Sequence, residues 1–315
     1  MTAPRGNRLA ELKQKLERVG ASPLRRFGQN FLLDRNQVLA ILRDADLSPL
    51  DTVLEVGPGS GFLSEGLAQT GAALLCVEID RRIAMLAREA IAPYPNAQLL
   101  EGDILDGKHA LNPEAIERIK ALWQSREGRL LKCISNLPYS VATPFIINML
   151  STDLPWSRGV FMVQKEVAQR ATAKAGSQDF GSLSVALGLA ATAVSFARSV
   201  PPDVFWPRPQ VQSAVLIIDY KSPAERLAIP WRALRQVANA IFCNRRKNLR
   251  NGLRLLFGKG EKDGPDAICA AMGLDGEAKA VNLTPETMLR IAHHIQDTGI
   301  ARDMPETETP EPAEE

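Results

Sequence analysis

The sequence predicts an α/β fold with a mostly parallel sheet of seven strands, an antiparallel last strand and a small all-α C-terminal domain. Between residues 52 and 163, short apolar runs alternate with segments of helical periodicity, which is typical of parallel strands joined by crossover helices. Two further apolar runs, Val194–Val200 and Ala214–Tyr220, flank a proline-rich segment and predict an antiparallel pair that closes the sheet. Beyond Pro230 the patterns are helical.

The N-terminal segment is amphipathic. Leu9, Leu12, Leu16 and Val19 recur at helical spacing among Lys and Arg residues. We therefore expect a short helix at the start of the chain, which packs on the body of the protein.

The seven expected strands are short apolar runs that end in polar, Gly or Pro residues, and they cover residues 52–56, 74–79, 98–100, 130–135, 159–163, 194–200 and 214–220. Helical spacing predicts helices around them at residues 37–44, 62–69, 81–90, 111–128 and 182–193, and over QKEVAQR at 164–170. The segment PPDVFWPRPQ, residues 201–210, is too rich in proline for either element and predicts a rigid loop at the rim of the site.

The C-terminal part follows an expected linker at 223–230 and has helical patterns at 231–244, 247–257, 266–272 and 285–296. The last residues are acidic and proline-bearing, with no large apolar side chain beyond Met304, so we expect disorder there. The expected domains are an N-terminal extension at 1–24, a sheet domain at 25–222, a helical domain at 231–298 and a disordered tail at 302–315.

A length of 315 residues suffices for one large α/β domain and a smaller one. Apolar runs are too short to cross a bilayer, and the charged N-terminus lacks the apolar core of a signal peptide. The cysteines at 76, 133, 243 and 269 form no C-x-x-C pair, so they are expected to be reduced and to hold no zinc. These features predict a cytoplasmic protein without a bound metal or a membrane partner.

The net charge of +2 is unevenly distributed. Residues 302–315 hold one Arg and six acidic residues, so the rest of the chain carries +7. Between Arg232 and Lys259, eight Lys and Arg residues occur without an acidic residue. A charge run is usually a solvated face, but eight uncompensated cations favour a surface that binds phosphate groups.

Three segments carry the strongest local signals: TVLEVGPGSG at 52–61, CVEID at 76–80 and SNLPY at 135–139. Each passes from an apolar run into polar, Gly or Pro residues, as a buried strand does where it enters a functional loop. Ligands of open α/β sheets bind outside the carboxyl ends of the strands. We therefore expect the three ends to meet at one site.

The glycine spacing discriminates between ligands. Gly57, Gly59 and Gly61 form G-x-G-x-G, and Phe62 stands where the dinucleotide fingerprint G-x-G-x-x-G requires glycine. The phosphate-binding pattern G-x-x-x-x-G-K-[ST] is missing as well. Glu78 follows Gly57 by 21 residues, where a carboxylate can accept both hydroxyls of a ribose. The pattern favours a nucleoside without a pyrophosphate; a turn used only for packing is the alternative.

In this order, GPGSG, VEID, EGDIL at 101–105 and SNLPY resemble the motifs of the Rossmann-like S-adenosylmethionine-dependent methyltransferases. Four more segments make the chain similar to the ribosomal RNA adenine dimethyltransferases: GQNFL at 28–32, QKEVAQR, FWPRPQVQSAV at 205–215 and FCNRRKNLRNGL at 242–253. The resemblance implies a monomeric enzyme with S-adenosylmethionine as methyl donor and no metal. Its substrate would be two adjacent adenosines in the 3′-terminal hairpin loop of small-subunit (16S) rRNA, in an immature 30S particle.

The resemblance assigns to the donor the residues Asn30, Leu32, Gly57, Gly59, Glu78, Asp103 and Asn136. Asn30 and Leu32 would contact the donor from above, and Asp103 would accept the exocyclic amine of its adenine. Two alternatives stay open. Phe31 and Leu32 can instead anchor a polar loop in the core, and Asp103 can satisfy the backbone amides of a turn.

The target nitrogen of adenine is a poor nucleophile because its lone pair is delocalised into the ring. Two acceptors on its hydrogens favour a pyramidal nitrogen with an available lone pair. The side-chain oxygen of Asn136 and the carbonyl of Leu137, held extended by Pro138, can be these acceptors, and Tyr139 can stack on the base. Catalysis would rest on alignment of nitrogen, methyl and sulfur, which can supply about 7–11 kcal/mol. A turn that merely ends a strand, with Tyr139 in the core, is the alternative.

A target adenine must leave its stack or be single-stranded to enter such a site. Phe205 and Trp206 can stack on it, although core packing is an equally open use for one of them. Phosphate contacts give affinity but little sequence discrimination, and we expect them from Arg245, Arg246, Lys247 and Arg250. The N-terminal helix is a further, less favoured RNA contact.

Two rival functions stay open. Resistance enzymes that methylate large-subunit rRNA share GQNF and an N-x-P-Y element, but FCNRRKNLRNGL favours the small-subunit substrate. The other rival is an RNA-binding assembly factor for which methylation is secondary, against which the intact GPGSG and SNLPY argue. A DNA adenine methyltransferase is disfavoured because the chain offers no separate target-recognition domain.

Overall fold

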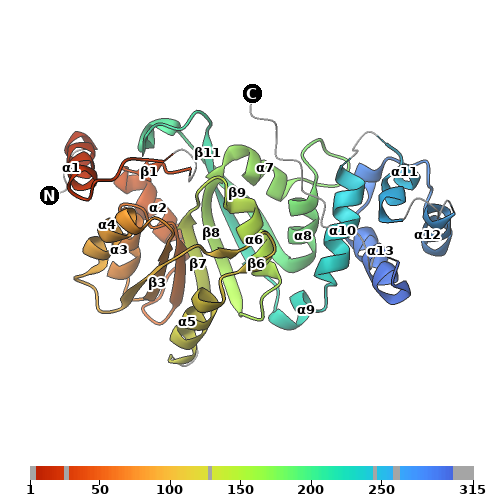
Figure 1. Cartoon of the computed structure of the whole chain (residues 1–315), viewed down its shortest axis with the longest axis horizontal. Helices are drawn as coiled ribbons and strands as arrows, with labels where there is room; N and C mark the ends of the chain where they lie inside the picture. Colours follow the sequence, from red (N-terminus) through yellow and green to blue (C-terminus); the bar gives the residue numbers. More distant parts are fainter. Residues whose placement is uncertain (1–4, 25–27, 127–129, 244–246, 258–262, 301–315) are drawn as a thin grey trace. The chain divides into compact units, whose positions relative to one another are not determined.

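The computed structural model describes residues 5–24, 28–126, 130–243, 247–257 and 263–300. Contacts divide the chain into two compact units (Figure 1): unit 1 consists of residues 1–168 and 191–223, and unit 2 of residues 169–190 and 224–315. Residues 169–190 therefore group with the helical unit, whereas we expected them in the sheet domain. The expected acidic tail at 302–315 lies outside the described residues.

Unit 1 is organised around a seven-stranded sheet, whose strands lie in the order β4 (Ala97–Glu101), β3 (Ala73–Glu78), β2 (Thr52–Val56), β7 (Leu131–Asn136), β8 (Trp156–Gln164), β11 (Ser213–Tyr220) and β9 (Ala191–Val200). β11 is antiparallel to both of its neighbours, and the other pairings are parallel. The predicted α/β class, the seven strands and the antiparallel last strand are confirmed.

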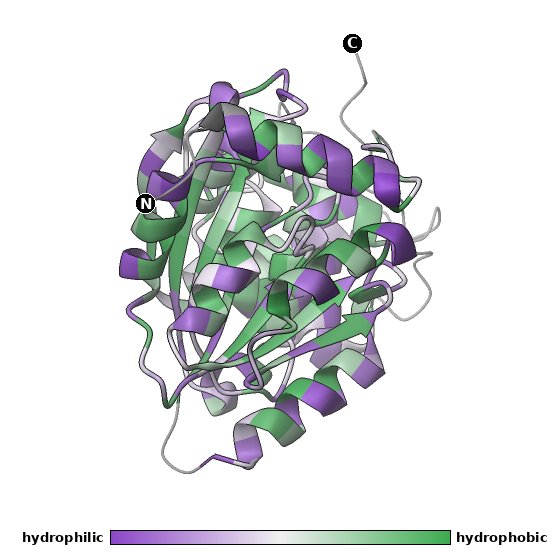
Figure 2. Cartoon of the chain, turned by 90° about the vertical axis from the view of Figure 1, so that its left-hand side faces the viewer, coloured by the Kyte–Doolittle hydropathy of each residue, from purple (hydrophilic) through white to green (hydrophobic). Residues whose placement is uncertain are grey.

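The helices of unit 1 are α1 (Arg5–Arg18), α2 (Arg35–Ala45), α3 (Phe62–Gln69), α4 (Arg81–Ile91), α5 (Pro113–Gln124), α6 (Ala142–Leu150) and α7 (Lys165–Thr172), the last of which runs on into unit 2. α2 and α3 share a core cluster with Val53 and Ile134. α5 packs on β2 and β3, and α6 places Phe145 edge-on against Phe161 of β8. Figure 2 shows hydrophobic residues along the strands and hydrophilic ones on the outward faces of the helices.

Side-chain caps begin two helices next to the carboxyl ends of the strands. Asp80 accepts hydrogen bonds from the backbone N–H groups of Arg82 and Ile83, so only two residues separate the end of β3 from the start of α4. Asp34 accepts from the N–H of Gln37 at 3.0 Å and begins α2. Such caps stabilise a helix by about 1 kcal/mol. They also fix where each strand passes into its loop.

The N-terminal helix α1 packs on unit 1. Leu12 and Leu16 are buried in a cluster with Phe31 and Leu33 and with residues of α4. Packing was the favoured alternative for this helix. α1 therefore supports the segment that carries GQNFL.

Several short elements of unit 1 were not predicted. β1 (Phe31–Leu32) pairs antiparallel with β10 (Phe205–Trp206), which follows the 3₁₀ helix η2 (Pro202–Val204). The prediction of neither helix nor strand at 201–210 was therefore wrong. The prolines flank a two-residue edge strand, where a missing N–H costs little. β5 (Leu105–Asp106) and β6 (Ala110–Leu111) form a hairpin.

Unit 2 consists of α8 (Ser182–Ala190), α9 (Pro223–Leu227), α10 (Trp231–Phe242), α11 (Leu249–Leu253), α12 (Gly264–Met272), α13 (Pro285–Thr298) and the 3₁₀ helices η3 (Arg254–Leu256) and η4 (Ala280–Asn282). The segment 223–230, which was expected to be a linker, begins with α9 and buries Arg226 completely. The helix expected at 247–257 is divided into α11 and η3. The helix expected at 182–193 ends at Ala190, where pairing with β11 begins.

Within the described part of the chain, no helix combines the length and the apolar character that crossing a membrane requires.

Candidate functional site

A cleft opens at the carboxyl ends of β2 and β7. The strand order reverses between these two strands, since the chain proceeds from β2 to β3 on one side and from β7 to β8 on the other. Such a switch point leaves a crevice in open α/β sheets. The cleft is lined by residues 28–32 and 136–139, by Glu55 and by most residues of 57–63. The structure thus brings GQNFL, GPGSG and SNLPY together.

Gly57 and Gly59 form one wall of the cleft, and both have left-handed backbone conformations, with φ of +66° and +59°. A Cβ on Gly57 would lie 3.1 Å from the ring carbons of Pro138, and one on Gly59 would lie 3.1 Å from the ring of Phe31. Only glycine combines this φ with so close an approach without strain. The wall is therefore a partly exposed stretch of backbone against which Pro138 and Phe31 pack.

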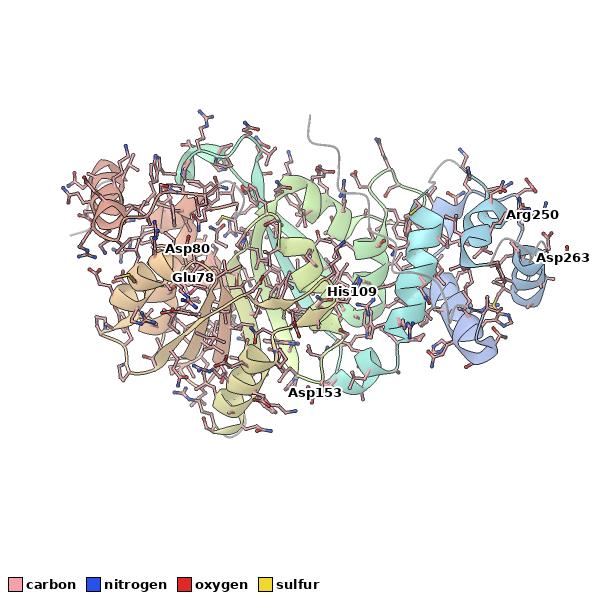
Figure 3. All side chains as sticks on the ribbon, in the orientation of Figure 1. Glu78, Asp80, His109, Asp153, Arg250 and Asp263 are labelled. Carbon is pink, nitrogen blue, oxygen red and sulfur yellow. The ribbon has the colours of Figure 1, made fainter. Side chains whose placement is uncertain are left out.

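Glu78 supports this wall from β3. Its Oε2 accepts a hydrogen bond from the N–H of Gly59 at 3.1 Å, and its Oε1 accepts one from the N–H of Asp80 at 3.1 Å. The side chains of Glu78 and Asp80 lie close together at this end of β3 (Figure 3). Burial raises the pKa of Glu78, which is only 5% exposed. Glu78 does not itself line the cleft, but each carboxylate oxygen keeps capacity for a further donor.

Asn136 forms the opposite wall. Its Nδ2 donates a hydrogen bond to the backbone carbonyl of Asn30 at 3.1 Å. Within the described residues no donor reaches the Asn136 amide oxygen, so this acceptor is available to a ligand. Leu137 extends the pairing of β7 with β8, since its N–H donates to the carbonyl of Met162 at 3.0 Å.

Tyr139 closes this wall. Its hydroxyl is 2.8 Å from Oγ of Ser213, and the side chain is half-buried. Burial raises the pKa of Tyr139. A Cβ on Gly28 would lie 3.1 Å from the backbone nitrogen of Tyr139, so the GQNFL segment packs directly on SNLPY. The anchored hydroxyl holds the ring in place.

Asp103 and Phe205 do not line the cleft. Asp103 is exposed, and its Oδ1 accepts a hydrogen bond from the N–H of Leu105 at 2.9 Å. This is the turn role that was the alternative, and Oδ2 remains for a ligand. Phe205 is only 4% exposed and belongs to a core cluster with Leu32, which favours packing over stacking on RNA. Trp206 is partly exposed, with the amino group of Lys13 5.5 Å from its ring centre.

The expected phosphate-binding cations differ in their surroundings. In unit 2, Arg250 forms ion pairs with Asp266 at 2.6 Å and Glu277 at 2.9 Å; Figure 3 labels Arg250. Lys247 is exposed. Arg245 and Arg246 lie outside the described residues.

Glu55 is a candidate that the sequence analysis did not single out. It lies on β2, lines the cleft and is 1% exposed. Sγ of Cys76 donates a hydrogen bond to its Oε2 at 3.3 Å. Burial raises the pKa of Glu55 to about 7. The signal was an acidic residue in an otherwise apolar strand, and every residue of β2 is buried.

His, Cys, Asp and Glu side chains are not grouped in threes that could hold a metal ion anywhere in the described part of the chain.

Comparison with known proteins identifies the family of the chain. The family model for ribosomal RNA adenine dimethylase matches residues 22–297. The chain belongs to this family. It is 34% identical over 290 residues to ribosomal RNA small subunit methyltransferase A of Pediococcus pentosaceus, an alignment that covers 91% of this chain and 94% of the relative. The enzyme of the same name from Geobacillus kaustophilus is 35% identical over 274 residues, with 86% and 90% coverage.

Solved structures agree in fold. A dimethyladenosine transferase from Plasmodium falciparum matches with a TM-score of 0.68 at 20% identity, over 85% of this chain and 98% of that one. The 23S rRNA methyltransferase ErmE matches with a TM-score of 0.55 at 24% identity, over 85% and 100%. The predicted family and the enzyme class, an rRNA adenine dimethyltransferase, are confirmed.

Proposed function

We propose that this dimethyltransferase transfers methyl groups from S-adenosylmethionine to N6 of two adjacent adenosines. The substrate is the 3′-terminal hairpin loop of small-subunit (16S) rRNA in an immature 30S particle, late in assembly and in the cytoplasm. The observation that carries the proposal is the cleft lined both by the glycine backbone and by Asn136, whose amide oxygen accepts no hydrogen bond from the described residues. The small-subunit substrate is supported by relatives of that name at 34% and 35% identity.

In this proposal the protein acts as a monomer. Its sheet domain, expected at residues 25–222, binds the donor and the adenine. The helical domain, residues 231–298, binds RNA phosphates. Cations of the basic segment, which include Lys247, supply the phosphate contacts.

The residues of the cleft fit S-adenosylmethionine. Gly57 and Gly59 line the cleft with backbone, against which the donor can lie, while Pro138 and Phe31 pack where their Cβ atoms would be. Glu78, which already holds the N–H of Gly59, accepts the ribose hydroxyls. The GQNFL segment covers the donor with Asn30 and Leu32, both of which line the cleft. The remaining oxygen of Asp103 accepts the adenine amine.

Asn136 and Leu137, in the wall opposite the glycines, prepare the adenine nitrogen for methyl transfer. N6 of the target adenine donates its hydrogens to Oδ1 of Asn136 and to the carbonyl of Leu137, which frees the nitrogen lone pair. The lone pair attacks the methyl carbon, and the C–N bond forms as the C–S bond breaks and S-adenosylhomocysteine leaves. The nitrogen then loses one proton to solvent, because a methylated ammonium on adenine is acidic. The carbonyl of Asn30 fixes the Asn136 amide so that its oxygen faces the base.

Tyr139 holds the base in place. Stacking of one base on an aromatic side chain contributes about 1–3 kcal/mol. The bond between its hydroxyl and Ser213 keeps the ring from turning away. A second turnover requires the monomethylated nitrogen to rotate and present its remaining hydrogen to the same acceptors.

Mass mapping of ribosomal RNA from cells with and without this protein tests the substrate. We expect two adjacent dimethylated adenosines near the 3′ end of the small-subunit rRNA to disappear in the cells without it. A change in large-subunit rRNA instead would favour the resistance-type enzyme. Unchanged RNA with a delay in subunit assembly would favour the assembly factor.

The Asn136→Ala variant tests the mechanism. We expect kcat to fall by at least about 10²-fold, because loss of alignment at the reacting atoms has effects of this size. Donor affinity, measured by calorimetry, should change by only a few fold. Asn148→Ala is a matched control, since this buried amide on α6 also bonds to backbone carbonyls, but away from the cleft. Near-normal turnover of Asn136→Ala would refute the proposed activation.

A further inference from the structure

We propose that Ser135 is a positioning residue that fixes the distance between the two walls of the cleft. It lies on β7 directly before Asn136 and is 1% exposed, so it touches neither the donor nor the RNA. The proposal rests on the proposed function only in one respect: the glycine wall holds the donor and the Asn136 wall holds the base.

Of the three ladders that β2 and β7 form with each other and with their outer neighbours, the one between β2 and β7 ends early. The ladder between β2 and β7 ends at the pair formed by Leu54 and Cys133. By contrast, β2 stays paired with β3 as far as Val56, and β7 stays paired with β8 as far as Asn136. Continuing the register of β2 and β7 would bring Val56 beside Ser135. The strands therefore part just before the residues that form the cleft.

A side chain replaces the missing ladder bond. The backbone N–H of Val56 donates a buried hydrogen bond to Oγ of Ser135 at 2.8 Å. A buried N–H needs a partner, and a parallel ladder would have supplied a backbone carbonyl. The hydroxyl takes the place of that carbonyl as acceptor. It therefore ties the two strands at the point where their backbone ladder has already ended.

This bridge is the last link below the reacting groups. Gly57 follows Val56 on one side, and Asn136 follows Ser135 on the other. Beyond the bridge, Gly57 of one wall packs against Pro138 of the other. A Cβ built on Gly57 would lie 3.1 Å from the ring carbons of Pro138. The bridge thus sets the separation of donor and base, and displacements well below 1 Å matter for such alignment.

The Ser135→Ala variant removes the bridge and keeps the strand. We expect kcat to fall at least about tenfold, because misplacement of the reacting atoms by 1 Å costs about 10². The Kd values for S-adenosylmethionine and for RNA should stay within about threefold, since Ser135 contacts neither. Ser135→Thr keeps the hydroxyl and should restore most of kcat.

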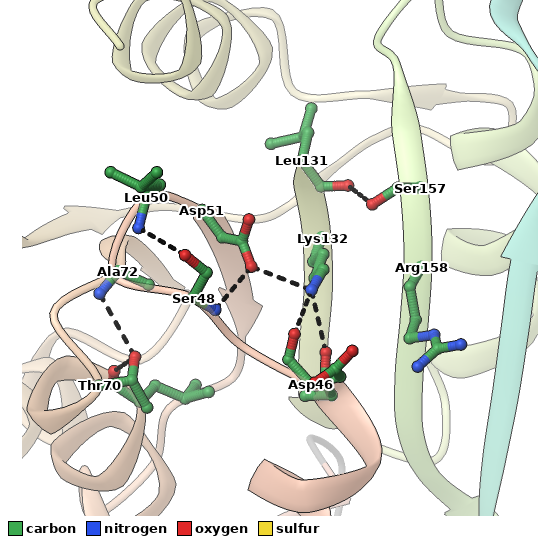
Figure 4. Close-up of polar contacts among 12 residues, drawn as sticks. Asp46, Ser48, Leu50, Asp51, Thr70, Ala72, Leu131, Lys132, Ser157 and Arg158 are labelled. Atoms are coloured by element: carbon green, nitrogen blue, oxygen red, sulfur yellow. Dashed lines mark hydrogen bonds and ion pairs between the residues drawn. The ribbon is translucent and has the colours of Figure 1, made fainter. Parts of the chain in front are cut away.

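Ser157→Ala is the matched control. Oγ of Ser157 on β8 also bridges two strands, because it donates to the carbonyl of Leu131 on β7 at 3.0 Å (Figure 4), but this bond lies at the amino ends of the two strands, away from the cleft. We expect near wild-type kcat for this variant. Urea unfolding of both variants shows how much stability each loses.

Two results would overturn the proposal. One is a kcat of Ser135→Ala within twofold of wild type. The other is a loss of kcat that Ser157→Ala reproduces at an equal loss of stability. If the threonine variant does not fold, Ser135→Cys replaces it, and its weaker acceptor should give an intermediate kcat; a kcat no higher than that of the alanine variant would count against the bridge. Should the wild-type enzyme methylate a different RNA, the proposed substrate fails, but the ratio of kcat values on that RNA still tests Ser135.

Discussion

Lys132 in unit 1 and Arg250 in unit 2 both form ion pairs, but in different surroundings. The Lys132 side chain is 5% exposed, and its Nζ lies 2.9 Å from a carboxylate oxygen of Asp51, whose side chain is also 5% exposed. The same amino group donates to the carbonyls of Ala45 at 3.2 Å and Asp46 at 2.5 Å (Figure 4), which end α2. Every donor has an acceptor, so Lys132 on β7 is a fixed link to the residue before β2 and to the end of α2.

The Arg250 side chain is 41% exposed, and its partners Asp266 and Glu277 are 55% and 63% exposed. Water competes for all three groups, so such pairs contribute little to stability. The comparison teaches that an ion pair of a basic side chain with a carboxylate fixes the structure where water is excluded. Where water has access, the same kind of pair can exchange its partners.

The largest effect expected from this comparison is on stability. Lys132→Ala leaves the carboxylate of Asp51 and the end of α2 without their buried donor, which costs about 3–5 kcal/mol in the free energy of unfolding. Arg250→Ala should cost at most about 1 kcal/mol. Urea unfolding of the two variants measures both. Equal losses would show that burial does not separate the two pairs.

A second buried charge of unit 1 makes stability depend on pH. Burial raises the pKa of Glu55 from 4.5 to about 7, so the folded protein holds a proton that the unfolded chain releases. The free energy of unfolding should therefore fall as pH rises from about 4.5 to about 7, by about 3 kcal/mol in all. Glu55→Gln should remove this fall.

Unfolding of wild type and Glu55→Gln at pH 5 and pH 8 checks this sign. Effects of the substitution that do not depend on pH cancel in the difference between the two conditions. A wild-type protein that gains stability over the variant between pH 5 and pH 8 would contradict a raised pKa for Glu55.

The sequence allowed prediction of features that local chain geometry determines. Gly57 and Gly59 were expected at a close approach of backbone to ligand, and both have positive φ in the cleft wall. Apolar runs with intervening helical patterns predicted the sheet and its antiparallel last strand. In each case a single residue type or a short pattern suffices, because alternatives are sterically excluded.

Contacts between distant residues could not be predicted in this way. The pairing of Phe31 with Trp206 creates two short strands that neither segment encodes alone. Arg250 lies in a run without acidic residues, yet the fold brings Asp266 and Glu277 to it. The charge pattern of the segment is local, whereas compensation of that charge is tertiary.

Two glycines, one in each unit, allow a further comparison, for which we expect an effect of intermediate size on stability. Gly57 in the cleft and Gly273 at the end of α12 have φ of +66° and +65°. A Cβ on Gly57 meets Pro138 at 3.1 Å, whereas one on Gly273 meets nothing within 4 Å. Alanine at either position should cost about 1–2 kcal/mol in the free energy of unfolding because of the left-handed backbone.

Only Gly57→Ala should also weaken binding of S-adenosylmethionine, as measured by calorimetry. Gly273→Ala is the control for strain without crowding of the cleft. Equal donor affinity of the two variants would mean that the backbone at Gly57 does not contact the donor.

The smallest effect concerns the use of cations in unit 2. Lys247 is exposed, and if it contacts a phosphate, Lys247→Ala should lower the slope of log affinity against log salt by about 0.7–0.9. Arg250 already binds Asp266 and Glu277, so its replacement should change the slope by much less. Titration of RNA at several salt concentrations measures both slopes.

Arg250→Ala can change RNA affinity without changing the salt slope. Removal of Arg250 leaves the carboxylates of Asp266 and Glu277 without their cation, and these carboxylates repel phosphates at long range. Arg250→Ala can therefore weaken RNA binding at low salt while the number of released counterions stays nearly the same. Circular dichroism and an unchanged donor affinity would show that the fold is intact. If Arg250→Ala lowers the slope as much as Lys247→Ala, then RNA opens the two ion pairs and takes Arg250 from them. The exposed ion pairs of Arg250 would then open when RNA binds, so that Arg250 could contact a phosphate. The buried ion pair of Lys132 could not be used in this way.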